Sequence, residues 1–177
     1  MKHVASVASF FVSRIDTLVD SLLEKHIAQG GPEAEIAKQV HGEVAVASAQ
    51  MAYQIYKDIF GSARFRKLAD KGARPQRLLW ASTGTKNHDY SDVKYIESLI
   101  GPDTVNTVPV ETLDAYRDHG EPKPLLEQDV EQAGRVLERL PEFRISIDMV
   151  TQQLEDEGVE KFNKPFDKLM ETLKEKS

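Results

Sequence analysis

Two short groups of polar and basic side chains follow apolar segments of the sequence, and together they could bind an anion. The first group has Ser9 and Arg14 around Phe11, and the second has Ser82 and Lys86 on either side of a Thr-Gly-Thr stretch. A phosphate ester requires charge neutralisation and several hydrogen-bond donors, which hydroxyls, a guanidinium and an ammonium supply. The pattern therefore favours a phosphate-binding rim. A structural interpretation stays open beside it, in which Arg14 pairs with a surface carboxylate and the Ser82 segment forms a turn and a helix cap.

Metal and cysteine chemistry have no comparable support. The sequence has no cysteine, which excludes disulfides, thiolate metal ligands and a cysteine nucleophile. The histidines share no metal-ligand spacing, and they are His3, His26, His41, His88 and His119. We therefore predict no bound metal. The carboxylates of Glu155, Asp156 and Glu157 are expected on a solvated helix face, and Trp80 is expected in the core.

The charge and hydropathy of the chain narrow the classes of partner. The 177 residues are 40% apolar and 29% charged, which is enough apolar material for a sizeable core. The net charge of −6, without a block rich in lysine or arginine, counts against nucleic acid or an anionic membrane as the main partner. The apolar runs fall short of the ~20 residues of a membrane span, and no apolar signal region stands at the start. We expect a mature, cytoplasmic protein.

Strands and helices are expected to alternate along the first two thirds of the chain. Residues 4–13, 77–82 and 104–108 are apolar throughout, which is typical of strands buried on both faces of a parallel sheet. Helical spacing of apolar residues covers the ranges 15–27, 33–60, 63–71, 91–100, 111–119, 126–140, 146–157 and 159–173. The Pro-containing linker 120–124 is too short for a domain boundary, so residues 1–177 are expected to form a single, helix-rich α/β domain.

Three strands are too few for a closed parallel barrel. A (β/α)₈ barrel needs eight strands and about 250 residues. If the strands are barrel units, roughly the first five are therefore missing, whereas a small open three-stranded sheet stays possible on pattern alone. In either case the phosphate rim would lie at the carboxyl ends of the strands, where parallel α/β proteins bind ligands.

Covalent catalysis through a Schiff base needs a lysine in a desolvated setting, so that its neutral amine is available. No lysine lies inside a predicted strand: Lys2 precedes the first, Lys86 follows the second, and the others fall in helices or turns. We therefore predict that this chain carries no such lysine.

Four strings of the sequence resemble the C-terminal part of bacterial transaldolases. They are VASFFVSRID (7–16), LWASTGTKN (79–87), YSDVKYIE (90–97) and LIGPDTVNTVP (99–109). The resemblance extends through the Gly158-Val159-Glu160-Lys161-Phe162 stretch and covers essentially the whole chain. It is strongest to the branch related to transaldolase/glucose-6-phosphate isomerase fusions.

The resemblance implies a fold and an activity. Transaldolases are (β/α)₈ TIM barrels that move a dihydroxyacetone unit between sugar phosphates, without a cofactor, in the non-oxidative pentose phosphate pathway. Their donors are fructose 6-phosphate and sedoheptulose 7-phosphate, and the acceptors are erythrose 4-phosphate and glyceraldehyde 3-phosphate. By resemblance, this chain would supply strands six to eight and the C-terminal helices.

The resemblance also implies roles for the rim residues. Ser9 matches a serine near the reacting carbon, Phe11 an aromatic wall and Arg14 the phosphate-binding arginine. Ser82 matches the strand-seven serine, and Lys86 is the nearest equivalent of a second phosphate-binding basic residue.

The family's Schiff-base lysine and acid/base carboxylates lie on earlier strands, so the isolated chain is expected to be inactive. Two hypotheses follow. One is a transaldolase-family chain that works with an N-terminal half-barrel chain or by self-association, and the other is a non-catalytic sugar-phosphate-binding half-barrel.

Overall fold

A parallel three-stranded sheet and nine helical segments make up the part of the chain, residues 4–175, that the computed structural model describes. The strands are β1 (Val7–Phe11), β2 (Arg77–Ala81) and β3 (Thr104–Asn106). The helices are α1 (Ser13–Gln29), α2 (Pro32–Val40), α3 (Val44–Gly61), α4 (Ala63–Ala69), α5 (Lys94–Glu97), α6 (Val110–His119), α7 (Val130–Arg139), the 3₁₀ turn η1 (Leu140–Phe143) and α8 (Ile147–Glu175). The predicted α/β class with three parallel strands and many helices is confirmed.

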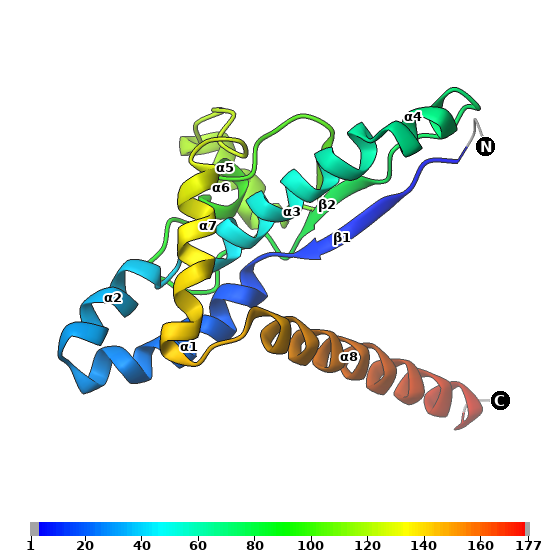
Figure 1. The fold of residues 1–177 in the computed structure, drawn as a ribbon. Coiled ribbons are helices and arrows are strands. Elements are labelled where there is room, and N and C mark those ends of the chain that lie inside the picture. Colours follow the sequence, from blue (N-terminus) through cyan, green and yellow to red (C-terminus); the bar gives the residue numbers. More distant parts are fainter. Residues whose placement is uncertain (1–3, 176–177) are drawn as a thin grey trace.

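The strands lie in the order β1-β2-β3, and both pairings are parallel (Figure 1). Phe11 stands opposite Ala81, and Trp80 stands opposite Asn106. The carboxyl ends of all three strands therefore lie on the same side of the molecule, and α1 begins there directly after β1. This arrangement places the sequence's two polar groups on neighbouring strand ends, as parallel pairing requires.

The core lies between the sheet and the helices α1, α3 and α7. Trp80, predicted to be a core residue, is 1% exposed and meets the ring of Phe10 edge to face. Small residues of α3 allow close packing, and Ala45 and Ala49 are fully buried. Leu23 of α1 and Leu126, which precedes α7, complete this cluster.

The first strand is shorter and more exposed than its composition predicted. Residues 4–13 were expected to form a strand buried on both faces, but β1 spans Val7–Phe11, and Val7 and Phe11 are 39% and 40% exposed. That prediction is wrong because only one face of β1 packs against the core: Phe10 contacts the core cluster, whereas the alternate residues Val7, Ser9 and Phe11 are exposed.

The single helix predicted over residues 33–60 is two helices. Val40 ends α2 and Val44 begins α3, and Gly42 between them has a φ of +79°. The turn is held by carboxylates of α1: Asp20 accepts a hydrogen bond from the Gly42 amide at 2.8 Å, and Asp16 accepts one from the Ala45 amide at 2.7 Å. Local periodicity cannot show a break that a distant helix stabilises.

Two other helix predictions differ from the structure. Residues 91–100 form turns around the four-residue α5. Residues 146–157 and 159–173 form one continuous helix, α8, which passes through Gly158 and Pro165.

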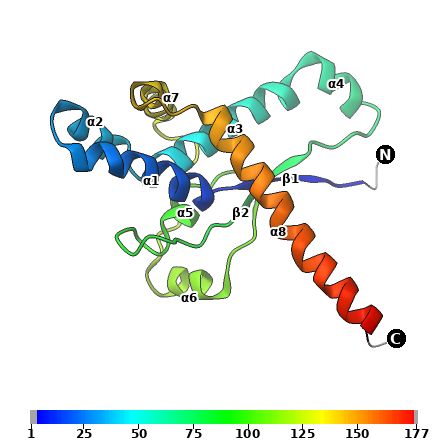
Figure 2. The ribbon, with the colours of Figure 1, turned by 90° about the horizontal axis from the view of Figure 1, so that it is seen from below.

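Helix α8 leaves the rest of the molecule after it passes α1 (Figures 1 and 2). Both views show its C-terminal part extending away from the sheet and from the other helices. Six large apolar side chains on this part are exposed: Val159, Phe162, Phe166, Leu169, Met170 and Leu173. Their spacing forms a stripe along one face of the helix.

Substitution of Gly42 by alanine tests the break between α2 and α3. A Cβ atom there would lie 2.7 Å from the Tyr90 hydroxyl oxygen, and the positive φ disfavours any L side chain. We expect Gly42→Ala to lower the free energy of unfolding by about 2 kcal/mol in urea titrations. The matched control is Gly134→Ala in α7, where a Cβ meets no atom within 4 Å. It should raise stability by about 0.5 kcal/mol, and equal effects of the two substitutions would contradict the described turn.

Candidate functional site

The two polar groups predicted from the sequence are joined through the backbone at the ends of β1 and β2. The Val12 amide donates to the Ala81 carbonyl at 2.9 Å, and the Ser13 amide donates to the Ser82 carbonyl at 3.0 Å. The first turn of α1 therefore lies directly against the segment that follows β2.

Arg14, Phe11 and Ser9 line one cavity. Its volume is about 510 Å³, and it lies between β1, the first turn of α1 and the middle of α8. The Arg14 guanidinium lies over the Phe11 ring, 4.9 Å from the ring centroid, so a cation–π contact holds it beside another residue of the cavity wall. Because Arg14 is in the first turn of a 17-residue helix, the positive end of the helix dipole adds to its charge. These two features favour an anion beside Arg14, whereas the rest of the cavity is lined mainly by apolar side chains.

The opposite wall of this cavity is formed by α8. The residues of α8 that line the cavity are Thr151, Leu154, Glu155, Gly158, Val159, Phe162 and Asn163. Glu155 was expected on a solvated helix face; it is exposed and also lines the cavity. A hydrogen bond from Gln153 and, to a smaller extent, the charges of Lys161 and Arg14 lower the pKa of Glu157.

Ser82 has a strained backbone. Its φ is 54°, in the left-handed region that L residues with a side chain seldom adopt. Its side chain is half-buried, and the next residue, Thr83, is fully buried and donates its hydroxyl hydrogen to Asn106 Oδ1 at 2.8 Å. Strain of this kind is often found where a ligand is bound, which makes Ser82 a candidate from geometry as well as from sequence.

Lys86 lies apart from Arg14. It is exposed and lines a different cavity, of about 250 Å³, together with Asp16, Asp20 and Glu24. Three carboxylates beside this ammonium make that cavity unfavourable for a phosphate. The structure thus brings together Ser9, Phe11 and Arg14 and places Lys86 outside the group.

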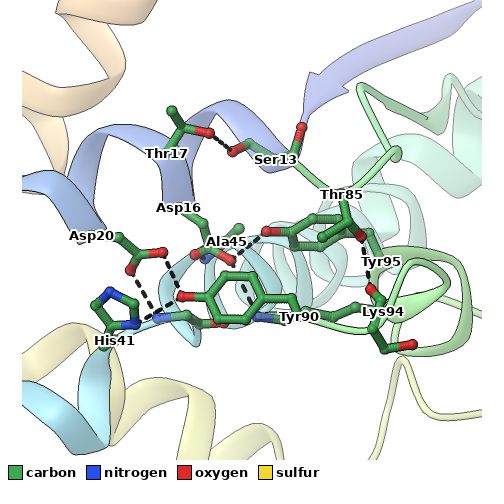
Figure 3. A network of polar contacts seen from close by, with 12 residues as sticks. Ser13, Asp16, Thr17, Asp20, His41, Ala45, Thr85, Tyr90, Lys94 and Tyr95 are labelled. Carbon is green, nitrogen blue, oxygen red and sulfur yellow. Dashed lines mark hydrogen bonds and ion pairs between the residues drawn. The ribbon is translucent and has the colours of Figure 1, made fainter. Parts of the chain in front are cut away.

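A buried polar network, which sequence reasoning missed, lies behind the first turn of α1 (Figure 3). Asp16 is 1% exposed; its Oδ1 accepts the Ala45 amide hydrogen, and its Oδ2 accepts the Tyr95 hydroxyl hydrogen at 2.8 Å. Lys94 Nζ lies 3.5 Å from the same Oδ2 and also donates to the Gly42 carbonyl. The buried carboxylate is therefore both hydrogen-bonded and paired with a cation.

Asp20, one turn further along α1, has a similar set of partners. Its Oδ2 accepts the Tyr90 hydroxyl hydrogen at 2.8 Å, and the Tyr90 oxygen lies 2.8 Å from His41 Nδ1. Burial raises the pKa of Asp20, and the hydrogen bonds from the Gly42 amide and Tyr90 partly offset that rise. Burial, together with the nearby carboxylates, also raises the pKa values of Tyr90 and Tyr95.

The sequence does contain a signal for this network. Asp16 and Asp20 are four residues apart and share the inner face of α1 with Ile15, Val19 and Leu23. Two carboxylates on an apolar helix face require buried partners. Their partners are 22 to 79 residues away in the sequence, so the signal indicates a network without identifying its members.

The described lysines are mostly exposed. Only Lys57 and Lys94 are partly buried among them, and both form ion pairs, with Glu127 and Asp16 respectively. Lys2, His3 and Lys176 lie outside the described residues.

Within residues 4–175, no group of three or more potential metal ligands comes together. No helix of this part has both the length and the apolarity to cross a membrane.

Comparisons with known proteins agree on one family. The family model described as Transaldolase/Fructose-6-phosphate aldolase matches residues 1–173. A protein named Transaldolase from Trichodesmium erythraeum (strain IMS101) is 49% identical, over 98% of this chain and 47% of its own length. Transaldolase 2 from Nostoc punctiforme is 47% identical, over 99% of this chain and 48% of its own length. Transaldolase from Thiobacillus denitrificans is 44% identical, over 96% of this chain and 46% of its own length. The chain spans about half the length of the curated relatives that it matches.

The strain at Ser82 is tested by comparing glycine with alanine at that position. Both substitutions remove the hydroxyl, but only glycine adopts a positive φ without steric conflict. We expect Ser82→Gly to be about 1 kcal/mol more stable than Ser82→Ala in urea unfolding. Ser9 inside β1 is the control position: there Ser9→Gly should be less stable than Ser9→Ala, because glycine weakens a strand. The same order at both positions would contradict the strained conformation.

The buried tyrosines predict a loss of stability at alkaline pH. Burial raises the pKa of Tyr53, Tyr56, Tyr90 and Tyr95 above the usual 10.0, so this contribution to stability is fully present below that value. Above about pH 10 the unfolded chain releases protons that the folded chain keeps, and the free energy of unfolding therefore falls. Urea unfolding between about pH 8 and pH 11, with tyrosinate absorbance recorded in parallel, measures this fall. Ionisation of these tyrosines in the folded protein near pH 10, with unchanged stability, would contradict it.

Proposed function

The chain belongs to the transaldolase/fructose-6-phosphate aldolase family, and from this premise we propose that it supplies the phosphate-binding part of a transaldolase barrel. The reaction would transfer a dihydroxyacetone unit through a Schiff base in the non-oxidative pentose phosphate pathway of the cytoplasm. The donors would be fructose 6-phosphate and sedoheptulose 7-phosphate, and the acceptors erythrose 4-phosphate and glyceraldehyde 3-phosphate. The observation that carries the proposal is the placement of Arg14 at a helix N-terminus, over Phe11 and beside a cavity at the strand ends.

The proposed roles follow the chemistry of each side chain. Arg14 would bind the phosphate group with paired, charge-assisted hydrogen bonds. Ser9, two residues before Phe11 on β1, would contact the substrate near its reacting carbon, and the Phe11 ring would form a wall of the sugar site. Ser82 would support the phosphate from the end of β2. The assignment of Lys86 as a second phosphate ligand stays a prediction, and it would require a movement away from the neighbouring carboxylates.

We propose further that the Schiff-base lysine lies outside this chain. A nucleophilic lysine must be neutral, and an adjacent carboxylate favours the charged form. Lys94 and Lys57, the partly buried lysines of the described part, are both paired with carboxylates. The remaining described lysines are exposed, whereas a Schiff-base lysine needs a desolvated setting. The isolated chain would then bind sugar phosphates without turnover.

The catalytic groups would come from an N-terminal half-barrel in a separate chain, whereas self-association, the other predicted interaction, would cover exposed surfaces without adding a Schiff-base lysine. Among the described residues β1 and β3 are the sheet edges, and an edge strand presents unpaired backbone groups to a further strand. The exposed apolar stripe of α8 offers additional surface to the same partner. The alternative function is a non-catalytic sugar-phosphate-binding half-barrel. One observation favours it: the Arg14 cavity is formed by this chain's own residues, so binding would need no second chain.

Binding of fructose 6-phosphate to the 177-residue chain tests the proposal. Isothermal titration should detect binding that Arg14→Gln weakens at least about tenfold, the usual effect of losing a charge-assisted hydrogen bond. The matched control is Arg135→Gln, an exposed arginine of α7, which should leave the affinity unchanged. Binding that is absent, or that does not depend on Arg14, contradicts the proposal.

Activity separates the two candidate functions. The chain alone should show no dihydroxyacetone transfer, and borohydride should trap no substrate on its lysines. Mixing with a half-barrel of strands one to five from a relative should restore transfer, with trapping on that half only. Failure of a folded, associated mixture to react would favour the non-catalytic function. Trapping on a lysine of this chain would overturn the assignment of the nucleophile.

A further inference from the structure

The buried carboxylates of α1 connect the two segments that carry the proposed phosphate site. Arg14 lies two residues before Asp16 in the first turn of α1. Ser82 follows β2, and the chain that continues from Ser82 reaches Tyr90 and Tyr95, whose hydroxyls bind α1. Together with the hydrogen bond from the Ser13 amide to the Ser82 carbonyl, these contacts join α1 to the segment after β2 at several points. Figure 3 shows the Tyr90 and Tyr95 hydroxyls directed at the Asp20 and Asp16 carboxylates.

The geometry of Asp16 fixes the first turn of α1 from two directions. Oδ1 is bound by the Ala45 amide at the start of α3, and Oδ2 is bound by Tyr95 of α5. Rotation of α1 about its axis would break at least one of these bonds and leave a buried carboxylate oxygen without a donor, which is strongly unfavourable. The backbone of Arg14 therefore keeps one position relative to the strand ends.

A second tether lies one turn along the helix. Asp20 is bound by the Gly42 amide and by the Tyr90 hydroxyl. The contacts of Asp20 add to those of Asp16, so that both rotation of α1 about its axis and tilting of the helix would break buried hydrogen bonds. Lys94 stabilises the pair of tethers, since its ammonium lies against the Asp16 carboxylate and 3.8 Å from the Tyr90 ring centroid.

We propose that Tyr95, through Asp16, and Tyr90, through Asp20, are positioning residues that hold the Arg14 guanidinium in place for the phosphate group. This inference deepens the proposed function and rests on it for the identity of the ligand. None of these four side chains lines the Arg14 cavity, so they act through the orientation of α1. Small displacements of a binding group weaken binding sharply, which gives such tethers a role in affinity as well as in stability.

The control must separate positioning from stability, because any buried hydrogen bond stabilises a fold. Tyr53 offers that control: it is 3% exposed, and its hydroxyl donates to the Pro102 carbonyl at 3.1 Å, in a part of the core that contains no tether. Tyr53→Phe and Tyr95→Phe each remove one buried hydroxyl. Tyr95→Phe should lower the free energy of unfolding more than Tyr53→Phe, because the Tyr95 hydroxyl donates to a buried carboxylate, so both variants are compared under conditions in which they are fully folded.

Nuclear magnetic resonance relaxation of the Arg14 Nε–Hε group in the free 177-residue chain is the first measurement. We expect Tyr95→Phe to make this group more mobile and Tyr53→Phe to leave it as in the unsubstituted chain. Unchanged Arg14 mobility in Tyr95→Phe overturns the inference, whether or not a sugar phosphate binds. If Tyr95→Phe does not fold, the half-buried Tyr90→Phe is read in the same way.

Titration with fructose 6-phosphate is the second measurement. Tyr95→Phe should weaken binding about fivefold and Tyr90→Phe about threefold, while Tyr53→Phe should not weaken it. If Tyr95→Phe and Tyr53→Phe bind fructose 6-phosphate with equal affinity, the contacts of Tyr95 and Tyr90 only stabilise the fold, and the inference is overturned. Absence of Arg14-dependent binding in the unsubstituted chain is a different result, since it contradicts the proposed function itself.

Discussion

Two carboxylates buried on the inner face of α1 impose the main constraint on this structure. A carboxylate removed from water must be given hydrogen bonds or a cation, and Asp16 and Asp20 obtain them from α3, from the turn before it and from the residues after β2. These contacts end α2 at Val40 and place the segment after β2 against α1. The same first turn of α1 carries Arg14, so the fold and the proposed site depend on one set of interactions.

The proposed division of function between two half-barrels would explain the uneven chemistry of this chain. The described residues include a guanidinium at a helix N-terminus, an aromatic ring beneath it and a strained serine, which the proposal assigns to binding. The partly buried lysines of the described part form ion pairs, whereas a nucleophilic lysine must be neutral. Under the same proposal, the sheet edges and the exposed stripe of α8 would contact the elements that supply the covalent chemistry.

Much of the fold could be predicted from the sequence, because strand composition and helical periodicity are local properties. The three strands, their parallel class and most helices follow from such patterns, and so does the burial of Trp80. The break at Gly42 could not be predicted, because it depends on Asp20 from another helix. The exposure of β1 could not be predicted either, because it depends on which faces of the strand other elements pack against. For the site, residue types indicated Ser9, Phe11 and Arg14 as neighbours. The separation of Lys86 from Arg14 depends on the path of the chain after Thr83, which spacing does not encode.

We propose that the phosphate of a sugar phosphate binds to this chain at Arg14 and the first turn of α1. Phosphorus-to-proton distances in the complex with fructose 6-phosphate, measured by nuclear magnetic resonance on isotope-labelled protein, report this binding mode. We expect contacts from the phosphorus to the Arg14 side chain and to the amides at the start of α1. Contacts to Lys86 without Arg14, or to the exposed face of α8, would show that the phosphate binds elsewhere.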